Sequence, residues 1–255
     1  MYDHVCLKCN KEFTSKKKEQ KYCSKSCANS VSTSNRKVED ISIFSEGLNA
    51  TNTYILGLIY SDGCISYDKH TKRFRITISM NERILLEKIR MLMTPTKKLY
   101  TYKHPNGREN TYSVISTNPQ DIEFLFKLGL TERKSLNISY PNILAEFDKD
   151  FIRGYFDGDG SVYKSTTNTY YKGVKRSYDY LRVKFTTGSK LFAIQLKECL
   201  EYHNILSKVF QDSRGKESYY VSIQGKEYVK KFHEYLYRDC DIWMERKYNK
   251  FIEMI

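Results

Sequence analysis

The sequence lacks the features that place a protein in a membrane or outside the cell. Its 255 residues contain no apolar run of about 18 residues, the length of a membrane-spanning helix. The first residues, Met1 to Cys6, lack the apolar stretch of a secretory signal peptide. We therefore expect no membrane partner and a non-secreted, intracellular location. The signature of disorder is missing too, because aromatic residues make up 14% of the chain and hydrophobic residues 40%. A packed core is expected.

Acidic residues are in deficit. The chain has 30 acidic against 43 basic residues, a formal net charge of +13. The basic excess is spread along the whole chain instead of forming one tail. This distribution favours a polyanion bound along a long surface, and nucleic acid is the obvious one. The alternative is a lysine-rich surface that only confers solubility.

The seven cysteines are an odd number, and in a reducing compartment clustered cysteines favour metal binding over disulfides. Four of them follow the spacing of a tetrahedral zinc site, which predicts structural Zn²⁺ held by Cys6, Cys9, Cys23 and Cys27. Residues 1–30 are predicted to be a zinc-binding module, since so short a segment has too little core to fold alone. Residues 31–47 are predicted to be a linker. A tail of free thiols is the alternative. The remaining cysteines are expected to pack as small hydrophobic residues.

The rest of the chain contains an internal repeat. Ile55 to Gly63 and Ile152 to Gly160 share a glycine, two bulky apolar residues and a final Asp-Gly, at an offset of 97 residues. Two copies of a unit predict two similar half-domains, residues 48–145 and 146–255, related by a pseudo-two-fold axis.

Within each half-domain the pattern predicts the order αββαββα and hence an α+β fold. One predicted strand alternates apolar Phe74 and Ile76 with basic Arg73 and Arg75. A period of two with one apolar and one basic face is typical of a half-buried antiparallel strand.

The repeated Asp-Gly suggests a metal site. Each aspartate is expected at the C-terminal end of a helix, and Gly57 and Gly154 would let the two helices approach closely. Asp62 and Asp159 would then meet, and their repulsion favours a divalent cation between them. Oxygen ligands select a hard cation such as Mg²⁺, which can activate water in phosphodiester hydrolysis. The alternative is that each Asp-Gly simply begins a turn.

These two segments resemble the signature of the LAGLIDADG homing endonucleases. The second segment matches closely, whereas Tyr60 occupies the first acidic position of the first. The resemblance implies two half-domains that form a DNA-binding saddle, a monomer, and Mg²⁺-dependent staggered cleavage of a long, non-palindromic double-stranded target. It also implies metal ligation and catalysis by Asp62 and Asp159, with Ser61 and Gly158 at the metal.

The family places a lysine late in each half-domain near the scissile phosphates. The repeated Glu-Arg-Lys makes Lys134 and Lys247 the catalytic candidates, with a surface position on the last helix as the alternative. Their neighbours Arg133 and Arg246 could make these contacts instead.

The resemblance further implies that the basic strand faces lie in the DNA major groove. The expected groove residues are Arg73, Arg75, Arg182 and Lys184. Loop residues expected to meet phosphates are Lys69, Lys103, Arg108, Lys172, Lys175, Arg176, Arg214 and Lys216. A solvated strand face is the alternative for each of them.

Two other functions share this fold. One is an intron maturase, with the host intron RNA as partner, and the other is a DNA-binding regulator without cleavage. The pair of intact aspartates favours a nuclease over the regulator. The sequence also contains a stretch at residues 22–27 that resembles the small zinc ribbons appended to mobile-element nucleases.

Overall fold

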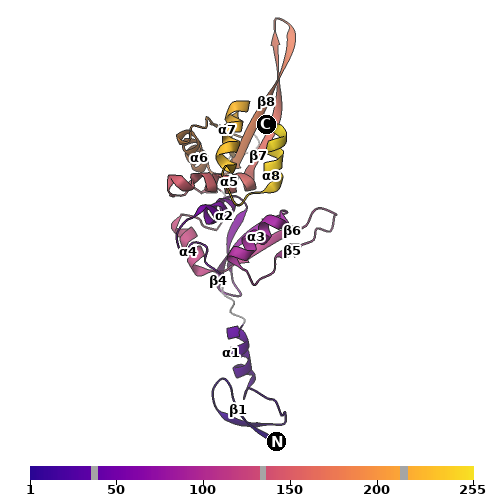
Figure 1. Cartoon of the computed structure of the whole chain (residues 1–255), viewed down its shortest axis with the longest axis vertical. Coiled ribbons are helices and arrows are strands. Elements are labelled where there is room, and N and C mark those ends of the chain that lie inside the picture. Colours follow the sequence, from indigo (N-terminus) through magenta and orange to yellow (C-terminus); the bar gives the residue numbers. More distant parts are fainter. Residues whose placement is uncertain (36–39, 133–135, 213–217) are drawn as a thin grey trace. The chain divides into compact units, whose positions relative to one another are not determined.

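The computed structural model describes residues 1–35, 40–132, 136–212 and 218–255. The chain divides into two compact units, Met1–Glu39 and Asp40–Ile255 (Figure 1). Within the described part of the chain, every helix is too short or too polar to cross a membrane.

The first unit is a short hairpin followed by a helix. Strands β1 (Tyr2–Val5) and β2 (Glu12–Ser15) pair antiparallel, and α1 spans Lys25–Asn35. Among the described residues of this unit, Cys6 is the only hydrophobic residue that is buried. The unit therefore has almost no apolar core to hold it together.

The second unit follows the predicted order αββαββα twice and then adds a final helix. The first half-domain consists of α2 (Ala50–Ser61), β3 (Gly63–Asp68), β4 (Arg73–Met80), α3 (Arg83–Met93), β5 (Tyr100–Tyr102), β6 (Thr111–Ser116) and α4 (Pro119–Lys127). The second consists of α5 (Asp148–Asp159), β7 (Gly160–Tyr171), β8 (Val174–Thr187), α6 (Lys190–Tyr202), β9 (Lys208–Gln211), β10 (Tyr219–Gln224), α7 (Lys226–Tyr237) and α8 (Glu245–Met254). The α+β fold class is confirmed.

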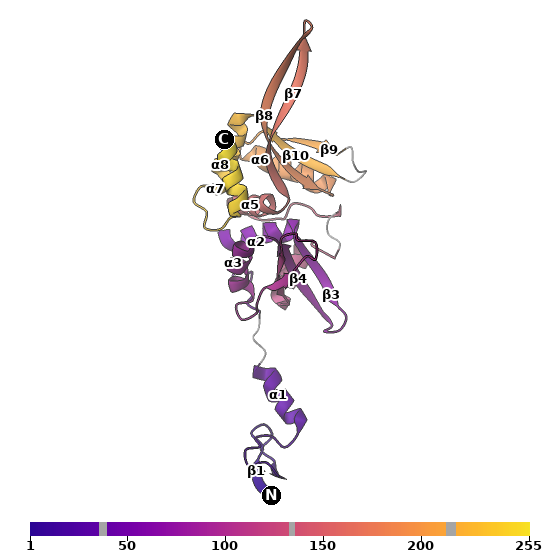
Figure 2. The ribbon, with the colours of Figure 1, turned by 90° about the vertical axis from the view of Figure 1, so that its right-hand side faces the viewer.

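Each half-domain contains one four-stranded antiparallel sheet, and the two sheets have equivalent strand orders, β3-β4-β6-β5 and β7-β8-β10-β9. The α2–α5 pair lies between the two half-domains (Figure 2). Both half-domains share one hydrophobic core, which runs from Phe44 to Phe251 and includes nearly all of α2.

Helices α2 and α5 touch through their backbones. A Cβ atom on Gly57 would lie 2.2 Å from the carbonyl oxygen of Phe151, and one on Gly154 would lie 2.0 Å from that of Tyr54. Both distances are far below van der Waals contact, so only glycine fits at either position. This close approach is the one that the sequence predicts.

The same helix pair makes two different side-chain contacts at equivalent places. Tyr60 of α2 meets Phe151 of α5 edge to face, with ring centroids 5.0 Å apart. On the other side, Tyr54 of α2 donates a hydrogen bond of 2.7 Å to Asp157 of α5. In the repeat, Tyr60 corresponds to Asp157 and Tyr54 to Phe151. The helix pair is therefore symmetric in backbone but not in side-chain chemistry.

The structure differs from the predicted linker over residues 31–47. Helix α1 continues to Asn35, and the chain from Asp40 onward belongs to the second unit. Asp40 is buried and accepts hydrogen bonds from Lys97 Nζ and from the backbone N–H of Thr117. Asp121 accepts from the hydroxyl of Ser42 at 2.6 Å. These buried carboxylates anchor a segment whose polar composition had suggested a linker.

The segment that connects the half-domains packs on the second of them. Ser189 Oγ donates to the Ile138 carbonyl at 2.6 Å, and the Tyr140 N–H donates to Gln195 Oε1 at 2.8 Å. Residues near Ile138 and Tyr140, which precede the second half-domain in the chain, are therefore fastened to it.

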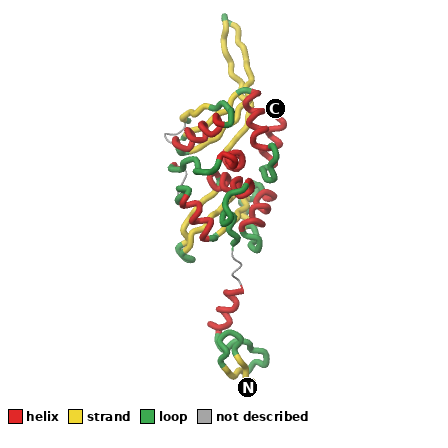
Figure 3. Tube along the Cα trace, turned by 60° about the vertical axis from the view of Figure 1, so that its left-hand side comes forward, coloured by secondary structure: helices red, strands yellow, loops and turns green. Residues whose placement is uncertain are grey.

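Strands β7 and β8 extend well beyond their counterparts β3 and β4. They pair continuously from Gly160 opposite Phe185 to Tyr171 opposite Val174, and they form a two-stranded ribbon that projects from the half-domain (Figures 1 and 3). The connecting residues Lys172 and Gly173 both have positive φ, 50° and 79°, as a two-residue type I′ turn requires. Lys172, Lys175 and Arg176, which were expected in a loop, thus lie at the tip of a ribbon.

Candidate active site and DNA interface

The aspartate of each repeat lies at the C-terminal end of its helix. Asp62 is the C-cap of α2, and Asp159 is the last residue of α5. The two ends meet, because a Cβ atom on Gly158 would lie 1.9 Å from Ser61 Oγ and 3.1 Å from Asp62 Oδ2. The missing side chain at Gly158 is therefore what lets Asp62 approach the end of α5.

The carboxylates of Asp62 and Asp159 both shift the pKa values of Tyr155 and Lys247. Burial raises the pKa of Tyr155, and the charges of Asp159 and Asp62 raise it further. The same two charges oppose the effect of burial on the pKa of Lys247. Two acids within electrostatic reach of the same groups form a local concentration of negative charge, and such a site favours a cation.

Lys247 caps the C-terminal end of α5. Its side chain is buried, and Nζ donates to the carbonyls of Phe156, Gly158 and Gly160 at 2.7, 2.7 and 2.6 Å. Burial lowers its pKa to about 8, so at pH 7 it remains an ammonium group facing the negative end of the helix dipole. The interpretation of a surface position is wrong for Lys247. Its three hydrogen bonds hold the backbone on both sides of Asp159.

The other residues expected at this site differ in what they contribute. Ser61 Oγ donates back to carbonyls of its own helix, those of Gly57 and Leu58, both at 3.2 Å. Arg246 is exposed and donates to Glu82 Oε1 of the first half-domain at 2.6 Å. Lys134 and Arg133 lie outside the described residues.

Asp157 is a buried carboxylate of the helix pair that the sequence reasoning did not single out. It is fully buried and accepts hydrogen bonds from Tyr54 Oη and the Met244 N–H, both at 2.7 Å, and from Tyr237 Oη at 3.3 Å. Burial raises its pKa to about 6, although these hydrogen bonds and Lys247 oppose the shift. Asp157 ties both LAGLIDADG-like helices to the chain before α8. Its place two residues before Asp159 in the repeat was the available signal.

Residues 146–237 match a family model described as a LAGLIDADG-like domain. The I-SmaMI LAGLIDADG homing endonuclease bound to cleaved DNA superposes with a TM-score of 0.53 at 14% identity, covering 84% of this chain and 88% of that one. The I-LtrWI LAGLIDADG homing endonuclease bound to target DNA gives 0.52 at 17% identity, covering 80% and 89%. This chain has the LAGLIDADG homing endonuclease fold.

Sequence relatives of this chain are much longer proteins. A probable translation initiation factor IF-2 of Methanocaldococcus jannaschii is 26% identical over 193 residues, which are 70% of this chain and 14% of the relative. The DNA-directed RNA polymerase subunit Rpo1C of the same organism is 27% identical over 183 residues, 71% of this chain and 18% of the relative. The chain thus spans less than a fifth of the length of these relatives.

The sheet of the first half-domain presents basic residues on the face opposite its core. Arg73 and Arg75 are exposed and alternate with the core residue Ile76 along β4. Arg75 Nε donates to Ser66 Oγ at 3.1 Å on the neighbouring strand, which orients its guanidinium along the sheet. Other exposed basic residues lie in the turns at the ends of the strands, namely Lys69, Lys103 and Arg108.

The sheet of the second half-domain has the same polarity, but its basic residues are less exposed and make more contacts with neighbouring side chains. Arg182 and Lys184 are half-buried and alternate with the core residues Val183 and Phe185. Lys184 Nζ forms an ion pair of 3.3 Å with Asp212 and lies 4.1 Å from the ring centroid of Tyr220. The predicted Arg214 and Lys216 lie outside the described residues.

The β7–β8 ribbon continues this face outward. Alternate residues of β8 share one face, and this row contains Arg176, Tyr178, Tyr180, Arg182 and Lys184. Two cation–π contacts order the row: Arg182 lies 5.7 Å from the ring centroid of Tyr180, and Arg176 lies 5.2 Å from that of Tyr171. Lys172 and Lys175 are exposed at the tip. The ribbon thus carries an alternating basic and aromatic surface.

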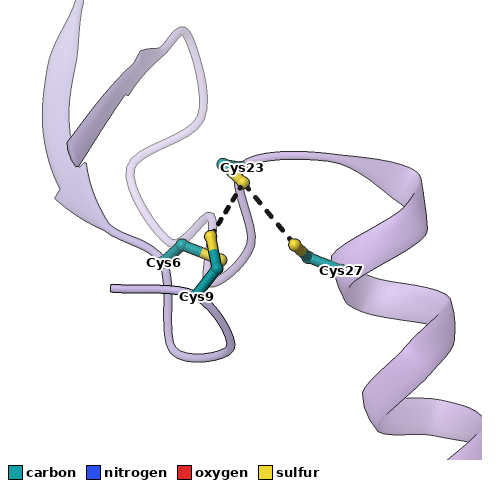
Figure 4. A group of neighbouring side chains, drawn as sticks. All are labelled: Cys6, Cys9, Cys23 and Cys27. Carbon is teal, nitrogen blue, oxygen red and sulfur yellow. Dashed lines mark hydrogen bonds between the residues drawn. The ribbon is translucent and has the colours of Figure 1, made fainter. Parts of the chain in front are cut away.

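The cysteines of the first unit converge on one point (Figure 4). The sulfurs of Cys6, Cys9, Cys23 and Cys27 all lie within 4.8 Å of one another. Backbone N–H groups of Cys23, Lys8 and Cys9 lower the pKa of the Cys6 thiol to about 6, although burial opposes this. Four sulfurs at these distances fit a tetrahedral zinc ion, and the N–H groups would stabilise a thiolate ligand.

Proposed function

We propose that this protein is a site-specific DNA endonuclease that acts as a monomer. It makes a metal-dependent, staggered double-strand break in a long, non-palindromic target. The observation that carries the proposal is the meeting of two acidic helix ends between two sheets with basic outer faces. The superposable I-SmaMI and I-LtrWI structures, both complexes with DNA, support DNA as the partner.

Asp62 and Asp159 are proposed to hold Mg²⁺, with Gly158 and Ser61 beside it. Carboxylate oxygens suit this hard cation, and the absent Cβ of Gly158 leaves Asp62 access to the end of α5. When bound, the ion would supply an activated water and stabilise the leaving oxygen of the phosphodiester. Lys247 is proposed to act as a positioning residue, because its three hydrogen bonds fix the backbone that carries Asp159. In this proposal the protein supplies the geometry and the cation supplies the reactive water.

The two sheet faces support a non-palindromic target. Arg73 and Arg75 project from the first sheet, whereas the second presents Arg182, Lys184 and the long ribbon. Arginine reads guanine through two hydrogen bonds in the major groove, so different side chains on the two faces would read different sequences. A shared hydrophobic core joins the half-domains, which supports action as a monomer.

The first unit is proposed to bind structural Zn²⁺ and to add affinity for DNA. Among the described residues of this unit Cys6 is the only buried hydrophobic side chain, and lysines surround the four cysteines in the sequence. Removing residues 1–39 should therefore weaken DNA binding, while excess protein should still cut at the same position.

Cleavage by Asp159→Asn protein tests the proposal. The substrate is DNA of the protein's own locus without the insertion, supplied with Mg²⁺. The unaltered protein should give one discrete double-strand break. Asp159→Asn should abolish the break while DNA affinity stays within a few-fold, because the variant loses a metal ligand but no basic residue. Asp241→Asn, an exposed aspartate before α8, is the matched control and should cut normally.

The alternatives give different results in the same experiment. A regulator would bind the DNA without cutting it, with or without Asp159. A maturase would bind its host intron RNA, and a parallel binding assay with that RNA would detect this. Normal cleavage by Asp159→Asn would refute the assignment of the metal site.

A further inference from the structure

A second group of metal-ligating side chains lies in the LAGLIDADG unit, far in sequence from the four cysteines. Asp148 begins α5, while Cys199 and His203 lie on the last turn and C-cap of α6. One ligand atom from each of the three lies within 4.8 Å of the others. Three residues separated by up to 55 positions thus converge between the ends of two helices.

The connecting segment between the half-domains closes this group. Tyr140 Oη donates to Asp148 Oδ1 at 2.8 Å and lies 3.3 Å from Cys199 Sγ. His203 Nε2 lies 3.0 Å from Asp148 Oδ2. Asp148 is buried, and Cys199 and His203 are half-buried, so water has limited access to the group.

One polar atom beside the group lacks a partner. The ring of Tyr235 of α7 lies against that of His203, with ring centroids 4.8 Å apart and an angle of 35° between the ring planes. Its hydroxyl is buried and makes no hydrogen bond to any described residue. A buried hydroxyl without a partner is costly, and a thiolate ligand nearby would accept a hydrogen bond from it.

We propose that Asp148, Cys199 and His203 form a second zinc site. Imidazole nitrogen, thiolate sulfur and carboxylate oxygen are all ligands of Zn²⁺, and a mixed set of this kind suits it better than Mg²⁺ or Ca²⁺. The fourth position would be taken by Tyr140 Oη or by water. Binding would release the thiol proton of Cys199 to solvent.

The position of the site suggests a structural role. Its ligands belong to α5 and α6, and Tyr140 belongs to the segment that joins the half-domains. A cation here would fasten that segment to the second half-domain, at the opposite end of α5 from Asp159. The site is therefore proposed to stabilise the protein without taking part in cleavage.

Zinc content of the full chain tests this inference separately from the four-cysteine site. Protein carrying Cys6→Ser and Cys9→Ser loses the first zinc site. It should still retain one zinc ion per chain, measured by mass spectrometry of the metal after dialysis. Adding His203→Ala should remove this ion, whereas His70→Ala, an exposed histidine in the β3–β4 turn, should leave it in place.

Cobalt binding keeps the test decisive if the His203 variant does not fold. The Cys6→Ser, Cys9→Ser protein should bind Co²⁺ with the visible absorption of a tetrahedral site and a thiolate charge-transfer band, and Cys199→Ser should lose that band. Zinc should also raise its melting temperature relative to protein treated with a chelator. Zinc-free Cys6→Ser, Cys9→Ser protein that is not stabilised by zinc would overturn the inference. Asp148, Tyr140 and His203 would then form only a hydrogen-bond network.

Discussion

Replacing Gly154 by alanine is expected to damage both stability and cleavage, because this residue sets the spacing of α2 and α5. The new Cβ atom would lie 2.0 Å from the carbonyl oxygen of Tyr54 and 3.0 Å from the Leu58 nitrogen, where ordinary contact begins at 3.4 Å. Both neighbours are backbone atoms of a buried helix, so no side chain can rotate away. The helices must separate by about 1 Å, which an overpacked core resists at a cost of about 3 kcal/mol.

The separation has two measurable consequences. For a domain of this size, about 3 kcal/mol corresponds to a fall in melting temperature of about 6–12 °C. Asp62 and Asp159 would also move apart, and a displacement of about 1 Å at a reacting centre can cost about 100-fold in rate. Single-turnover cleavage with saturating protein, measured well below the melting temperature, isolates this effect from DNA binding.

Gly129→Ala provides the control for backbone strain alone. Gly129 has a φ of +84° and nothing within 4 Å of its missing Cβ, so alanine there introduces strain without a clash between helices. It should cost about 1 kcal/mol and leave the cleavage rate unchanged. A Gly154→Ala protein that melts and cuts like the unaltered protein would refute the idea that this contact sets the aspartate spacing.

Three further outcomes follow from individual side chains. Lys247→Met should lower stability by about 3–5 kcal/mol, since three buried carbonyls lose a charged donor, and should slow cleavage, whereas Lys250→Met on the same helix should do neither. Asp157→Asn should change how stability depends on pH. Burial raises the pKa of Asp157 to about 6, so the folded state binds more protons than the unfolded state, and the unfolding free energy should fall by about 3 kcal/mol between about pH 4 and 7. Urea titrations of the variant should not show this fall. Replacing Lys175 and Arg176 by alanine should weaken binding to all DNA sequences and lower the salt dependence by about 2 in logarithmic slope.

Each of these outcomes has a clear contradiction. A stable, active Lys247→Met protein would show that the end of α5 needs no cation. Identical pH profiles with and without the Asp157 carboxyl would mean that its pKa is not raised in the folded protein. An unchanged salt slope would place the ribbon tip away from DNA phosphates.

The features that could be predicted from the sequence are those set by residue spacing along the chain. The repeat of Gly57 and Gly154 with Asp62 and Asp159 predicts the helix pair, because glycine in equivalent positions of two apolar helices has few other uses. Period-two alternation along residues 73–80 likewise predicts a strand with one buried face, and cysteine spacing predicts the cluster in the first unit. These features depend on neighbours in sequence or on exact repetition.

The features that the sequence did not reveal depend on distant contacts. The repeated Glu-Arg-Lys singles out Lys247, but nothing local predicts that it is buried with its ammonium group bound to three carbonyls of α5 and β7. Residues 31–47 have the composition of a linker, but Asp40 becomes buried because Lys97 and Thr117 reach it from elsewhere. The β7–β8 ribbon is an exception among these features. The sequence did contain a local signal for it, since the stretch before Tyr170 is rich in threonine, a good strand former.

Because the side-chain contacts of α2 and α5 are unequal, each half-domain pairs better with the other than with a second copy of itself. If two copies of the second half-domain were paired, Asp157 would face Phe151 twice and bury two carboxylates without the phenol that Tyr54 provides. Two copies of the first would set Tyr60 against Tyr54. The helix pair therefore favours pairing of the first half-domain with the second over pairing of two identical half-domains. Chimeras that exchange half-domains with another protein should keep residues 54 and 157 together, and 60 with 151, as matched sets.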